Sequence, residues 1–476
     1  MTRRVLSVAS EAAPLVKTGG LADVAGALPA ALAPEGWEMR VILPAYPGLL
    51  ARLSAPALVW EGVLIGAPAR LWLGPVRGAP YHAYLLEAPH LYDRAGGPYS
   101  DAQGDYPDNP ERFAALCQAA AMLCEGGDAQ GWRPDVLHAH DWQAGLAPAY
   151  LKDRGIPVPS VFTIHNIAFQ GGAPADRLAA LGIPPHRYAR DGYEFWGQIS
   201  TLKAGLVSAD RITTVSPRYA QELMRPEFGM GMEGVLQARA GVLSGILNGI
   251  DHTVWNPASD PATVPFTRGN LAGKAENRAR LLAEFGLDPV EGPLVALVSR
   301  LTHQKGIDLI APAIGPLIDG GGGLVILGAG DPAMEAEMVA LAAAHPGRIA
   351  TRIGYDEALS HRMYAGADAV LVPSRYEPCG LTQIYALRYG ALPVVTATGG
   401  LWDTVIGAEP ASRDAATGIM VFPTDALALA QGLRRLVALH ADRDAFRRMQ
   451  LNAMAADFGW AASARAYAAL YRALTD

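Results

Sequence analysis

The chain has 476 residues, more than one ordinary hydrophobic core requires, and its length fits two or three domains. Half of the residues are hydrophobic and 18% are charged, a globular composition that excludes a disordered or fibrous protein. The net charge of −7 offers no basic field for nucleic acid or an anionic membrane, so neither partner is expected.

Cysteine usage and the N-terminus indicate a cytoplasmic protein. Cys117, Cys124 and Cys379 lack the spacing of zinc ligands and are typical of a reducing compartment. The apolar run behind Arg3 and Arg4 ends after a few residues, which is too short for a signal sequence. No apolar stretch is long enough to predict a membrane span.

Short β-branched runs alternate with turns and Ala/Leu-rich helical stretches, which predicts an α/β protein with parallel sheets. In the first half, residues 4–9 form the expected first strand and residues 22–32 its helix. Further strands are expected at 136–138, 160–164 and 211–215. Ligands bind at the carboxyl ends of such strands, so the loops that follow them are the candidate sites.

The same alternation restarts near residue 241 and predicts a second doubly wound domain. Its expected strands are 294–299, 324–327, 348–353, 369–372 and 393–396. A Thr-Gly-Gly-Leu sequence at 18–21 recurs at 398–401, which suggests a glycine loop at a strand end in each domain. Residues 96–110, rich in Gly, Pro, Asp and Asn, are expected to form a mobile exposed loop.

The loop 17–20, Lys-Thr-Gly-Gly, lies between the first strand and its helix. Bare backbone amides at such a turn can approach a phosphate, and Lys17 can neutralise it. A tight turn with a solvated lysine explains the same residues, so the segment alone leaves both interpretations open.

A second loop carries Arg300 and Lys305 behind an apolar strand. A guanidinium fork and an ammonium on one loop can clamp a diphosphate, although two ordinary surface charges fit the same spacing. A third loop, 374–383, leads into a helix expected at 381–389, whose first amides can face an anion. Glu377 in this loop suits sugar hydroxyls or a developing oxocarbenium ion; a helix cap is the alternative.

Histidines follow two strands of the first half. His138, His140 and Asp141 lie in one segment and His165 in another, and their polar side chains could meet in the cleft. Two histidines and an aspartate also suggest a metal site, but no carboxylate cluster completes it, so no metal is expected. The Gly-x-Ser-x-Gly elbow of a hydrolase triad is absent.

A nucleotide-dependent dehydrogenase is an alternative of a different class. Residues 328–333 formally satisfy the Gly-x-Gly-x-x-Ala pattern, and Asp356 lies near the position of a ribose-binding acid, so NAD is the cofactor of this alternative. However, Asp331 and Pro332 are equally typical of a helix cap and a first helical residue. The Asp-x-Asp triplet at 442–444 lies in a charged helical stretch and predicts no metal-diphosphate anchor.

In their order and spacing, the motifs resemble those of bacterial glycogen synthases and plant starch synthases, from about Arg4 to Tyr471. The segments that carry the resemblance are Lys-Thr-Gly-Gly-Leu at 17–21, His-Ala-His-Asp-Trp at 138–142, Asn-Gly-Ile-Asp at 248–251, Trp-Asn-Pro at 255–257, Gln-Lys-Gly at 304–306 and Glu-Pro-Cys-Gly-Leu at 377–381. The resemblance implies a GT-B fold, in which two Rossmann-like domains face a cleft.

The resemblance also implies a reaction. The expected enzyme is a retaining glucosyltransferase that moves glucose from ADP-glucose to the non-reducing 4-hydroxyl of an α-1,4-glucan such as glycogen, with neither a metal nor NAD. One alternative is a GT-B enzyme with another nucleotide sugar or acceptor, such as a sucrose- or trehalose-type enzyme. Another is a catalytically inactive glucan-binding module. The resemblance implies no particular oligomeric state.

Site residues are carried over motif by motif. The expected catalytic residues are Glu377, Lys305, Arg300 and His165. The expected donor-binding residues are Lys17, Gly19, Gly20, Asp23, Asp141, Asn248, Arg300, Lys305, Tyr355, Cys379, Gly380, Leu381 and Thr382. Of these, Arg300 and Lys305 are implied to hold the diphosphate, and Tyr355 to stack on adenine.

The implied domains are residues 1–242 on the acceptor side, residues 243–455 for the nucleotide sugar, and a C-terminal helix at 456–476 that crosses back to the first domain. Donor contacts are then divided between the two domains. We therefore expect the domains to close on the donor about a hinge at 241–249.

Overall fold

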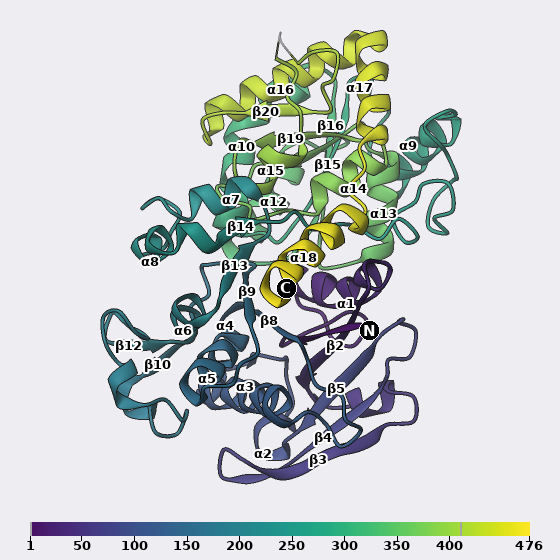
Figure 1. Ribbon diagram of the computed structural model, residues 1–476. Coiled ribbons are helices and arrows are strands. Elements are labelled where there is room, and N and C mark those ends of the chain that lie inside the picture. The colour runs from purple at the N-terminus through teal and green to yellow at the C-terminus, as the bar shows by residue number, and fades with distance from the viewer. Residues whose placement is uncertain (1, 410–411) are drawn as a thin grey trace. The chain divides into compact units, whose positions relative to one another are not determined.

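The computed structural model describes residues 2–409 and 412–476 and divides into two compact units (Figure 1). Unit 1 comprises Met1–Gly249 and Trp460–Asp476, and unit 2 comprises Ile250–Gly459. The chain therefore passes between units at 249/250 and 459/460, whereas the sequence placed these boundaries at 242/243 and 455/456. The expected hinge at 241–249 lies inside unit 1, where Leu243–Gly245 forms a strand of the main sheet.

Unit 1 is built on a nine-stranded sheet within the described residues, in the order β14-β13-β9-β8-β1-β2-β5-β4-β3. Its strands are β1 (Arg3–Val8), β2 (Trp37–Pro44), β3 (Ala57–Leu64), β4 (Ala67–Pro75), β5 (His82–Glu87), β8 (Val136–His140), β9 (Ser160–Ile164), β13 (Arg211–Thr214) and β14 (Leu243–Gly245). All neighbours pair in parallel except that β4 runs antiparallel to both β3 and β5. The antiparallel edge was not predicted, because its alternating strands carry no motif.

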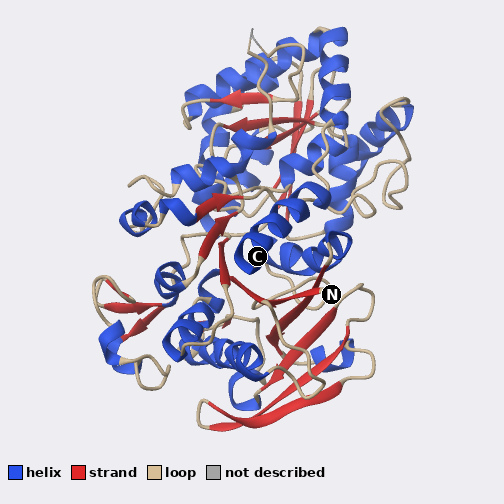
Figure 2. Ribbon diagram, viewed as in Figure 1, coloured by secondary structure: helices blue, strands red, loops and turns tan. Residues whose placement is uncertain are grey.

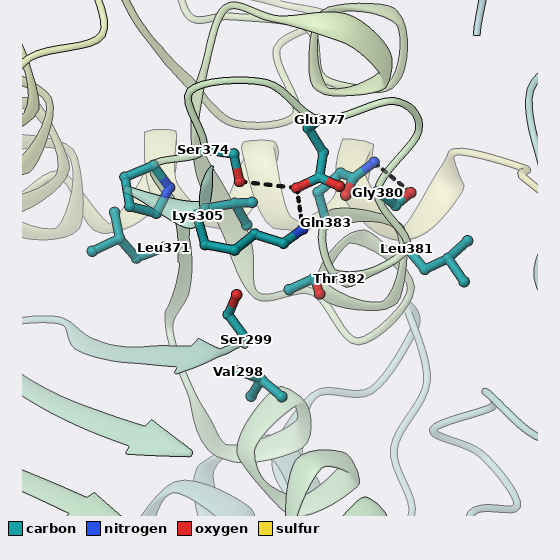
Figure 3. A pocket seen from close by; sticks show the side chains of 12 residues that line it. Val298, Ser299, Lys305, Leu371, Ser374, Glu377, Gly380, Leu381, Thr382 and Gln383 are labelled. Carbon is teal, nitrogen blue, oxygen red and sulfur yellow. Dashed lines mark hydrogen bonds and ion pairs between the residues drawn. The ribbon is translucent and has the colours of Figure 1, made fainter. Parts of the chain in front are cut away.

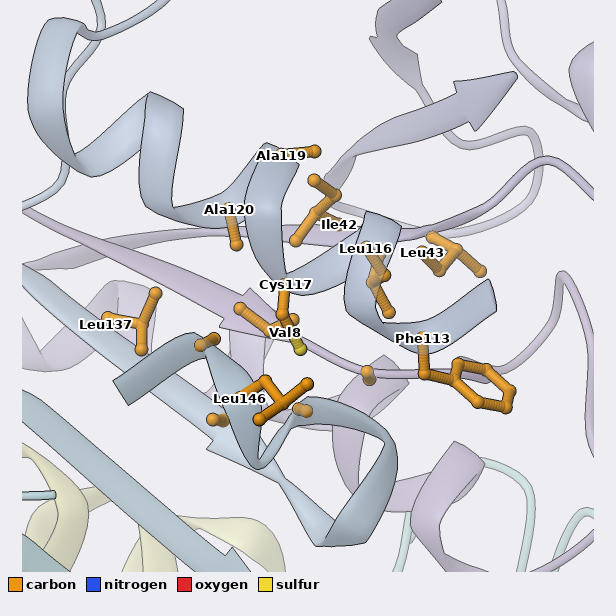
Figure 4. Packing of buried hydrophobic residues seen from close by; sticks show 14 of the residues in the cluster. Val8, Ile42, Leu43, Phe113, Leu116, Cys117, Ala119, Ala120, Leu137 and Leu146 are labelled. Carbon is orange, nitrogen blue, oxygen red and sulfur yellow. The ribbon is translucent and has the colours of Figure 1, made fainter. Parts of the chain in front are cut away.

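Helices cover the sheet of unit 1 (Figure 2). They are α1 (Gly20–Leu32), α2 (Pro89–Tyr92), α3 (Asn109–Gly126), α4 (Asp141–Ala144), α5 (Leu146–Arg154), α6 (Thr201–Ser208), α7 (Pro217–Glu222), α8 (Glu233–Ala238) and α18 (Trp460–Thr475). Helix α3 packs Phe113, Leu116 and Cys117 against strand residues such as Val8 and Leu137 (Figure 4). These side chains are almost completely buried, so apolar burial holds this face together.

The C-terminal helix α18 belongs to unit 1. Its Tyr471 is fully buried, stacks edge-on against Trp37 of β2 and lies 2.7 Å from His138 Nδ1 through its hydroxyl. Near the end of the helix, Arg3 donates to Thr475 Oγ1. The last residues of the chain thus complete the core beside the first two strands.

Residues 96–110 are mostly exposed, as the sequence predicts, but they also contain regular structure. They contain a small hairpin, β6 (Ser100–Asp101) with β7 (Gly104–Asp105), and Tyr106 and Asn109 are buried. The Arg94 guanidinium donates two 2.8 Å hydrogen bonds to the Asp108 carboxylate. Gly and Pro set the turns here, but a bidentate ion pair and buried side chains fix the loop.

A second small sheet of unit 1 joins β10 (Gly172–Pro174), β12 (Gln198–Ser200) and β11 (Glu194–Phe195).

In its described residues, unit 2 has a six-stranded, fully parallel sheet in the order β17-β16-β15-β18-β19-β20. Its strands are β15 (Leu294–Val298), β16 (Gly323–Gly328), β17 (Ile349–Ile353), β18 (Ala369–Val372), β19 (Leu392–Thr396) and β20 (Ile419–Val421). Five of these match predicted strands to within a residue or two at each end. Counted from β15, the order is 3-2-1-4-5-6, the doubly wound arrangement of nucleotide-binding domains.

Helices cover both faces of this sheet. They are α9 (Ala272–Phe285), α10 (Ile310–Ala313), α11 (Gly315–Asp319), α12 (Pro332–Ala344), α13 (Glu357–Gly366), α14 (Thr382–Arg388), α15 (Gly399–Thr404), α16 (Ala426–Ala441) and α17 (Arg443–Ala455). Two separate hydrophobic clusters result, as a sheet buried on both sides requires. No helix in the described residues is both long and apolar enough to cross a membrane.

Candidate active site

The topological switch point of unit 2 lies between β15 and β18, which are adjacent in the sheet but whose chain connections lead to opposite sides. Ligands of doubly wound sheets bind at this place, outside the carboxyl ends of the two strands. The loop after β15 carries Arg300 and Lys305, and the loop after β18 carries Glu377. The topology thus brings together two segments that the sequence singled out separately.

Lys305 and Glu377 form the centre of this site (Figure 3). Lys305 Nζ lies 2.5 Å from Glu377 Oε2, and Ser374 Oγ donates to the same oxygen at 2.9 Å. The two charged side chains are 18% and 7% exposed, so the ion pair is shielded from most of the solvent. The pair lines a cavity of about 50 Å³, whose other polar side chains are those of Ser299, Ser374, Thr382 and Gln383.

Two glycines allow the site loops to close on each other. Gly306 has φ = 67°, and a Cβ there would lie 2.0 Å from the carbonyl oxygen of Pro373. Gly399 has φ = 44°, and its Cβ would lie 1.9 Å from the carbonyl oxygen of Glu377. Any other residue at either position would push the loops after β15, β18 and β19 apart.

A second ion pair fixes the backbone of the site without facing the cavity. Arg375 donates to both oxygens of Asp308 at 2.7 Å and also to the carbonyl of His303. This fork ties the loop after β18 to the turn that holds Lys305 and holds the pKa of Asp308 below its usual value. Sequence analysis missed Arg375 and Asp308 as a pair, because they are far apart in the chain and only the fold joins them.

The other predicted donor residues of unit 2 lie on the same edge of the sheet. Arg300 is exposed, and Nη2 makes a 3.3 Å contact with Gln304 Oε1. Tyr355 follows β17; its ring is 79% exposed and its hydroxyl donates to Glu357. Cys379 is buried, whereas Gly380, Leu381 and Thr382 are partly exposed. Gln383, which was given no role, donates to the carbonyls of Cys379 and Gly380 and so fixes this turn.

The glycine pattern at 328–333 serves packing and helix capping. A Cβ on Gly328 would lie 2.0 Å from the Ser299 carbonyl, and one on Gly330 would lie 2.3 Å from that of Leu301. Asp331 caps α12 by accepting from the Ala333 amide, and Pro332 is the first helical residue. The two glycines are therefore explained by close packing against the loop after β15.

In unit 1 the switch point lies between β1 and β8, and the Lys-Thr-Gly-Gly loop is next to it. Glu11, which the sequence analysis overlooked, accepts hydrogen bonds from the amides of Thr18 (2.5 Å) and Gly19 (3.3 Å) and from the Thr18 hydroxyl. Tyr99 from the 96–110 segment donates to the same carboxylate. The structure thus differs from the expectation that these amides are bare: a resident carboxylate occupies the place predicted for phosphate.

Lys17 and Asp23 lie on opposite sides of this turn and contact each other. Lys17 Nζ is 2.7 Å from Asp23 Oδ1, and the side chains are 42% and 26% exposed. Gly20 begins α1, so Gly19 and Gly20 form the junction between loop and helix. Because it is exposed, this ion pair contributes little stability and leaves Lys17 available for exchange with a ligand.

The histidines come together in a row at the ends of β8 and β9, in which His138 and His140 are buried and His165 is partly exposed. His140 Nδ1 lies 3.0 Å from His165 Nε2, and His140 Nε2 lies 3.1 Å from Ser7 Oγ. His138 contacts Thr163 Oγ1 on its other side, at 2.6 Å. Burial lowers the pKa of His138 and of His165 to about 3, and that of His140 well below its usual value. All three rings are therefore neutral near pH 7.

Asp141 holds the end of β9 in place. Its Oδ1 accepts from the amides of His165 (2.7 Å) and Asn166 (3.4 Å), and its backbone adopts φ = 54°, uncommon for a residue other than glycine. Burial raises the pKa of Asp141 to about 7 despite these two amides. Asn248 is also buried, and its Oδ1 has no hydrogen-bond partner in the described part of the chain.

Two protein families match the chain. The starch synthase catalytic domain matches residues 4–238, and glycosyl transferases group 1 matches residues 283–451. The glycogen synthase of Cereibacter sphaeroides (strain ATCC 17025) is 58% identical over 475 residues, covering 99% of this chain and 98% of the relative. That of Paracoccus denitrificans is 57% identical over 476 residues, covering 99% of both chains.

Solved structures agree with these matches. The catalytic domain of starch synthase IV from Arabidopsis thaliana, bound to ADP and acarbose, is 31% identical with a TM-score of 0.89, covering both chains completely. A sucrose-phosphate synthase from Thermosynechococcus elongatus shares the fold at 21% identity, with a TM-score of 0.63 and 99% of both chains covered. The predicted two-domain GT-B fold is thus confirmed, and the chain belongs to the glycogen synthase family of retaining glucosyltransferases.

Proposed function

We propose that the protein transfers glucose from ADP-glucose to the non-reducing 4-hydroxyl of an α-1,4-glucan such as glycogen, with retention of the α configuration. The observation that carries the proposal is the ion pair of Lys305 and Glu377 at the switch point of unit 2, in a chain closely similar to glycogen synthases over its whole length. The related starch synthase IV structure with ADP and acarbose further supports a nucleoside diphosphate and a glucan as ligands.

Lys305 and Arg300 are proposed to hold the diphosphate. As the glycosidic bond breaks, positive charge develops on the sugar and negative charge on the departing diphosphate, so preorganised cations stabilise the transition state more than the ground state. Lys305 has three N–H donors and gives one to Glu377, which fixes the ammonium in place. Glu377 in turn presents its carboxylate to the sugar, where a negative charge favours the oxocarbenium-like transition state.

The remaining donor contacts are assigned by chemical type. The exposed ring of Tyr355 offers a flat apolar surface for adenine, and Gly380, Leu381 and Thr382 offer backbone amides to the phosphates. In unit 1, Lys17 and Asp23 are proposed to lie beside the donor. Asp141, His165 and Asn248 are proposed to contact glucose. Protein cations thereby replace a metal at the diphosphate, and the proposed reaction involves no electron transfer, so neither metal nor NAD is part of it.

Donor competition tests this proposal. Labelled ADP-glucose and UDP-glucose are mixed in equal amounts with glycogen and the purified protein, and the label incorporated into polymer is counted. The expected result is preferential incorporation of label from ADP-glucose. An enzyme that cleaves α-1,4 linkages should release this label from the polymer. Preferential incorporation from UDP-glucose, or transfer to fructose 6-phosphate or glucose 6-phosphate and not to glycogen, would assign the protein to the sucrose- or trehalose-type alternative.

A further inference from the structure

A row of three side chains leads from the interior of unit 1 to His165. Ser7 lies on β1 and His140 on the neighbouring β8, and both are completely buried. Ser7 Oγ is 3.1 Å from His140 Nε2, and His140 Nδ1 is 3.0 Å from His165 Nε2. Each ring nitrogen of His140 therefore has one hydrogen-bond partner. The nitrogen that carries the proton of the neutral ring determines whether Ser7 and His165 each donate or accept.

The hydroxyl hydrogen of Ser7 determines the direction of the hydrogen bonds from Ser7 through His140 to His165. A buried hydroxyl without an acceptor is unfavourable, and in the part of the chain that the structure describes, His140 Nε2 is the acceptor within reach. If Ser7 donates to Nε2, neutral His140 must carry its proton on Nδ1. His140 then donates to His165 Nε2, and neutral His165 must carry its own proton on Nδ1.

His138 belongs to a second set of hydrogen bonds, the other branch, which shares no hydrogen bond with the row of Ser7, His140 and His165. Its two ring nitrogens contact the Tyr471 hydroxyl at 2.7 Å and Thr163 Oγ1 at 2.6 Å, and Thr163 Oγ1 lies 2.5 Å from Thr213 Oγ1. The His138 and His140 rings lie 4.1 Å apart without a hydrogen bond between them. Burial lowers the pKa of both, which disfavours a cation at this point.

We propose that Ser7 and His140 are positioning residues that hold His165 as the neutral tautomer with its proton on Nδ1. His165 then offers a hydrogen-bond donor to an oxygen of the substrate and is not available as a proton acceptor. In the described residues Nδ1 of His165 has no hydrogen-bond partner, and the side chain is partly exposed, as such a donor requires. The consequence for catalysis rests on the proposed contact between His165 and glucose; the tautomer itself does not.

Nitrogen-15 NMR of histidine-labelled protein tests the tautomer directly, with His165→Gln used to assign the His165 signals. In the free protein near pH 7, the expected result is a protonated Nδ1 and a bare Nε2 on His165 and on His140 alike. A proton on Nε2 of His165 would reverse the row and overturn the proposal. Because no substrate is present, this result is independent of the donor and acceptor of the reaction.

Variants test the positioning role. His140→Leu removes the donor, so His165 is expected to move its proton to Nε2 and kcat to fall about tenfold, the effect of one ordinary hydrogen bond. His140→Asn returns an amide donor near the position of Nδ1 and is expected to recover part of both the tautomer and kcat. Thr213→Val is the matched control, because it breaks a buried hydroxyl contact of the other branch. It should leave the tautomer unchanged.

A folded His140→Leu protein that keeps the proton on Nδ1 of His165 would overturn the positioning role. The same would follow if Thr213→Val moved the tautomer as far as His140→Leu did, since general loosening of the core would then explain both. If the tautomer moves as expected while glucosyl transfer is unaffected, the row is correct and the proposed contact of His165 with glucose is wrong. Circular dichroism and thermal unfolding establish that each variant is folded.

Discussion

The two switch points of the molecule use opposite electrostatics. In unit 2, Lys305 with Glu377 and Arg375 with Asp308 form charged pairs that are partly open to solvent. In unit 1, the corresponding place is lined by buried histidines whose pKa values lie far below the usual range, and by Asp141, whose pKa is raised. The same doubly wound topology thus carries a charged pair in the cavity of unit 2, and in unit 1 a row of neutral histidines next to the exposed Lys17–Asp23 pair.

This difference suggests that the two units act on different parts of the donor. Fixed charges that are already paired in the free protein can respond to charge developing on a departing diphosphate without reorganisation. Neutral donors and acceptors are better suited to hydroxyl groups, which carry no charge at any stage. We therefore propose that unit 2 stabilises the charge that develops on the diphosphate and that unit 1 orients the sugar.

The repeated Thr-Gly-Gly-Leu sequence shows the same contrast locally. At 18–21 the loop amides bind the side-chain carboxylate of Glu11, whereas at 398–401 the Gly400 amide binds the backbone carbonyl of Glu377. In unit 2 the carboxylate of Glu377 is consequently left to Lys305 and Ser374. The motif thus hydrogen-bonds the side-chain carboxylate of Glu11 in unit 1, but only the backbone carbonyl of Glu377 in unit 2.

The largest effect is expected for Lys305→Ala, which removes the cation of the charged site. If that cation acts on the transition state, kcat should fall by about 10²–10³, corresponding to roughly 2.7–4 kcal/mol. Steady-state kinetics with ADP-glucose and glycogen measure this fall, and thermal unfolding checks the fold. Near-normal turnover of a folded variant would remove Lys305 from the proposed mechanism.

Glu377→Gln should have the next largest effect. The amide preserves size and hydrogen bonding but not the charge, so kcat should decrease by roughly ten- to hundredfold, the value of about 1.5–3 kcal/mol for a charged hydrogen bond, with a smaller loss of ADP affinity. Glu276→Gln is the matched control, because Glu276 forms an exposed pair with Arg280. Losses of equal size in kcat and ADP affinity would make Glu377 a binding residue alone.

Asp141→Asn probes the neutral site through its pH dependence. Between the unfolded pKa near 3.8 and the folded value of about 7, the folded protein binds the extra proton, so ionisation of Asp141 lowers stability as pH rises. The asparagine variant lacks this penalty and tolerates the same backbone conformation. Its Tm relative to the wild-type protein should therefore be higher at about pH 8 than at about pH 4.

Calorimetric scans of both proteins between about pH 4 and pH 8 measure this difference in Tm. Because the variant retains the histidines, their contribution to the pH dependence is the same in both proteins and cancels in the comparison. Their low folded pKa values act in the opposite sense, since neutral buried histidines cost stability as pH falls below 6.5. A Tm difference that does not change with pH would mean that Asp141 is ionised throughout and that the site of unit 1 is not neutral.

The smallest effect is expected for chelation. Exhaustive treatment with EDTA should change the transfer rate little, because Lys305 and Arg300 supply the positive charge that a metal would otherwise provide. The assay compares treated enzyme with and without added magnesium or manganese. Activity lost to EDTA and restored by either ion would contradict the assignment of diphosphate binding to protein cations alone.

The sequence predicted what depends on local pattern. Strands such as Ser160–Ile164 and Ala369–Val372 were predicted at their observed bounds, because buried parallel strands are uniform apolar runs. The motif order also predicted the family and the GT-B fold. The antiparallel edge of unit 1 and the hairpin within 96–110 were missed, since their register depends on contacts distant in the chain.

The site was predictable as a set of residues but not as a set of contacts. Motifs supplied Lys305 and Glu377, yet only the strand order β15 next to β18 puts them in contact. Glu11 was missed because a lone glutamate carries no pattern, although it determines where the amides of Thr18 and Gly19 point. Protonation states such as that of Asp141 follow from burial, which a motif does not contain.

The central claim, that unit 2 carries the diphosphate charge and unit 1 orients the sugar, is tested by ADP binding and turnover in two variants. Isothermal titration with ADP and kinetics with ADP-glucose are measured for Lys305→Ala and His165→Ala. We expect Lys305→Ala to lose both ADP affinity and kcat, whereas we expect His165→Ala to lose kcat and to bind ADP as the wild-type protein does. A comparable loss of ADP affinity in both variants would contradict it.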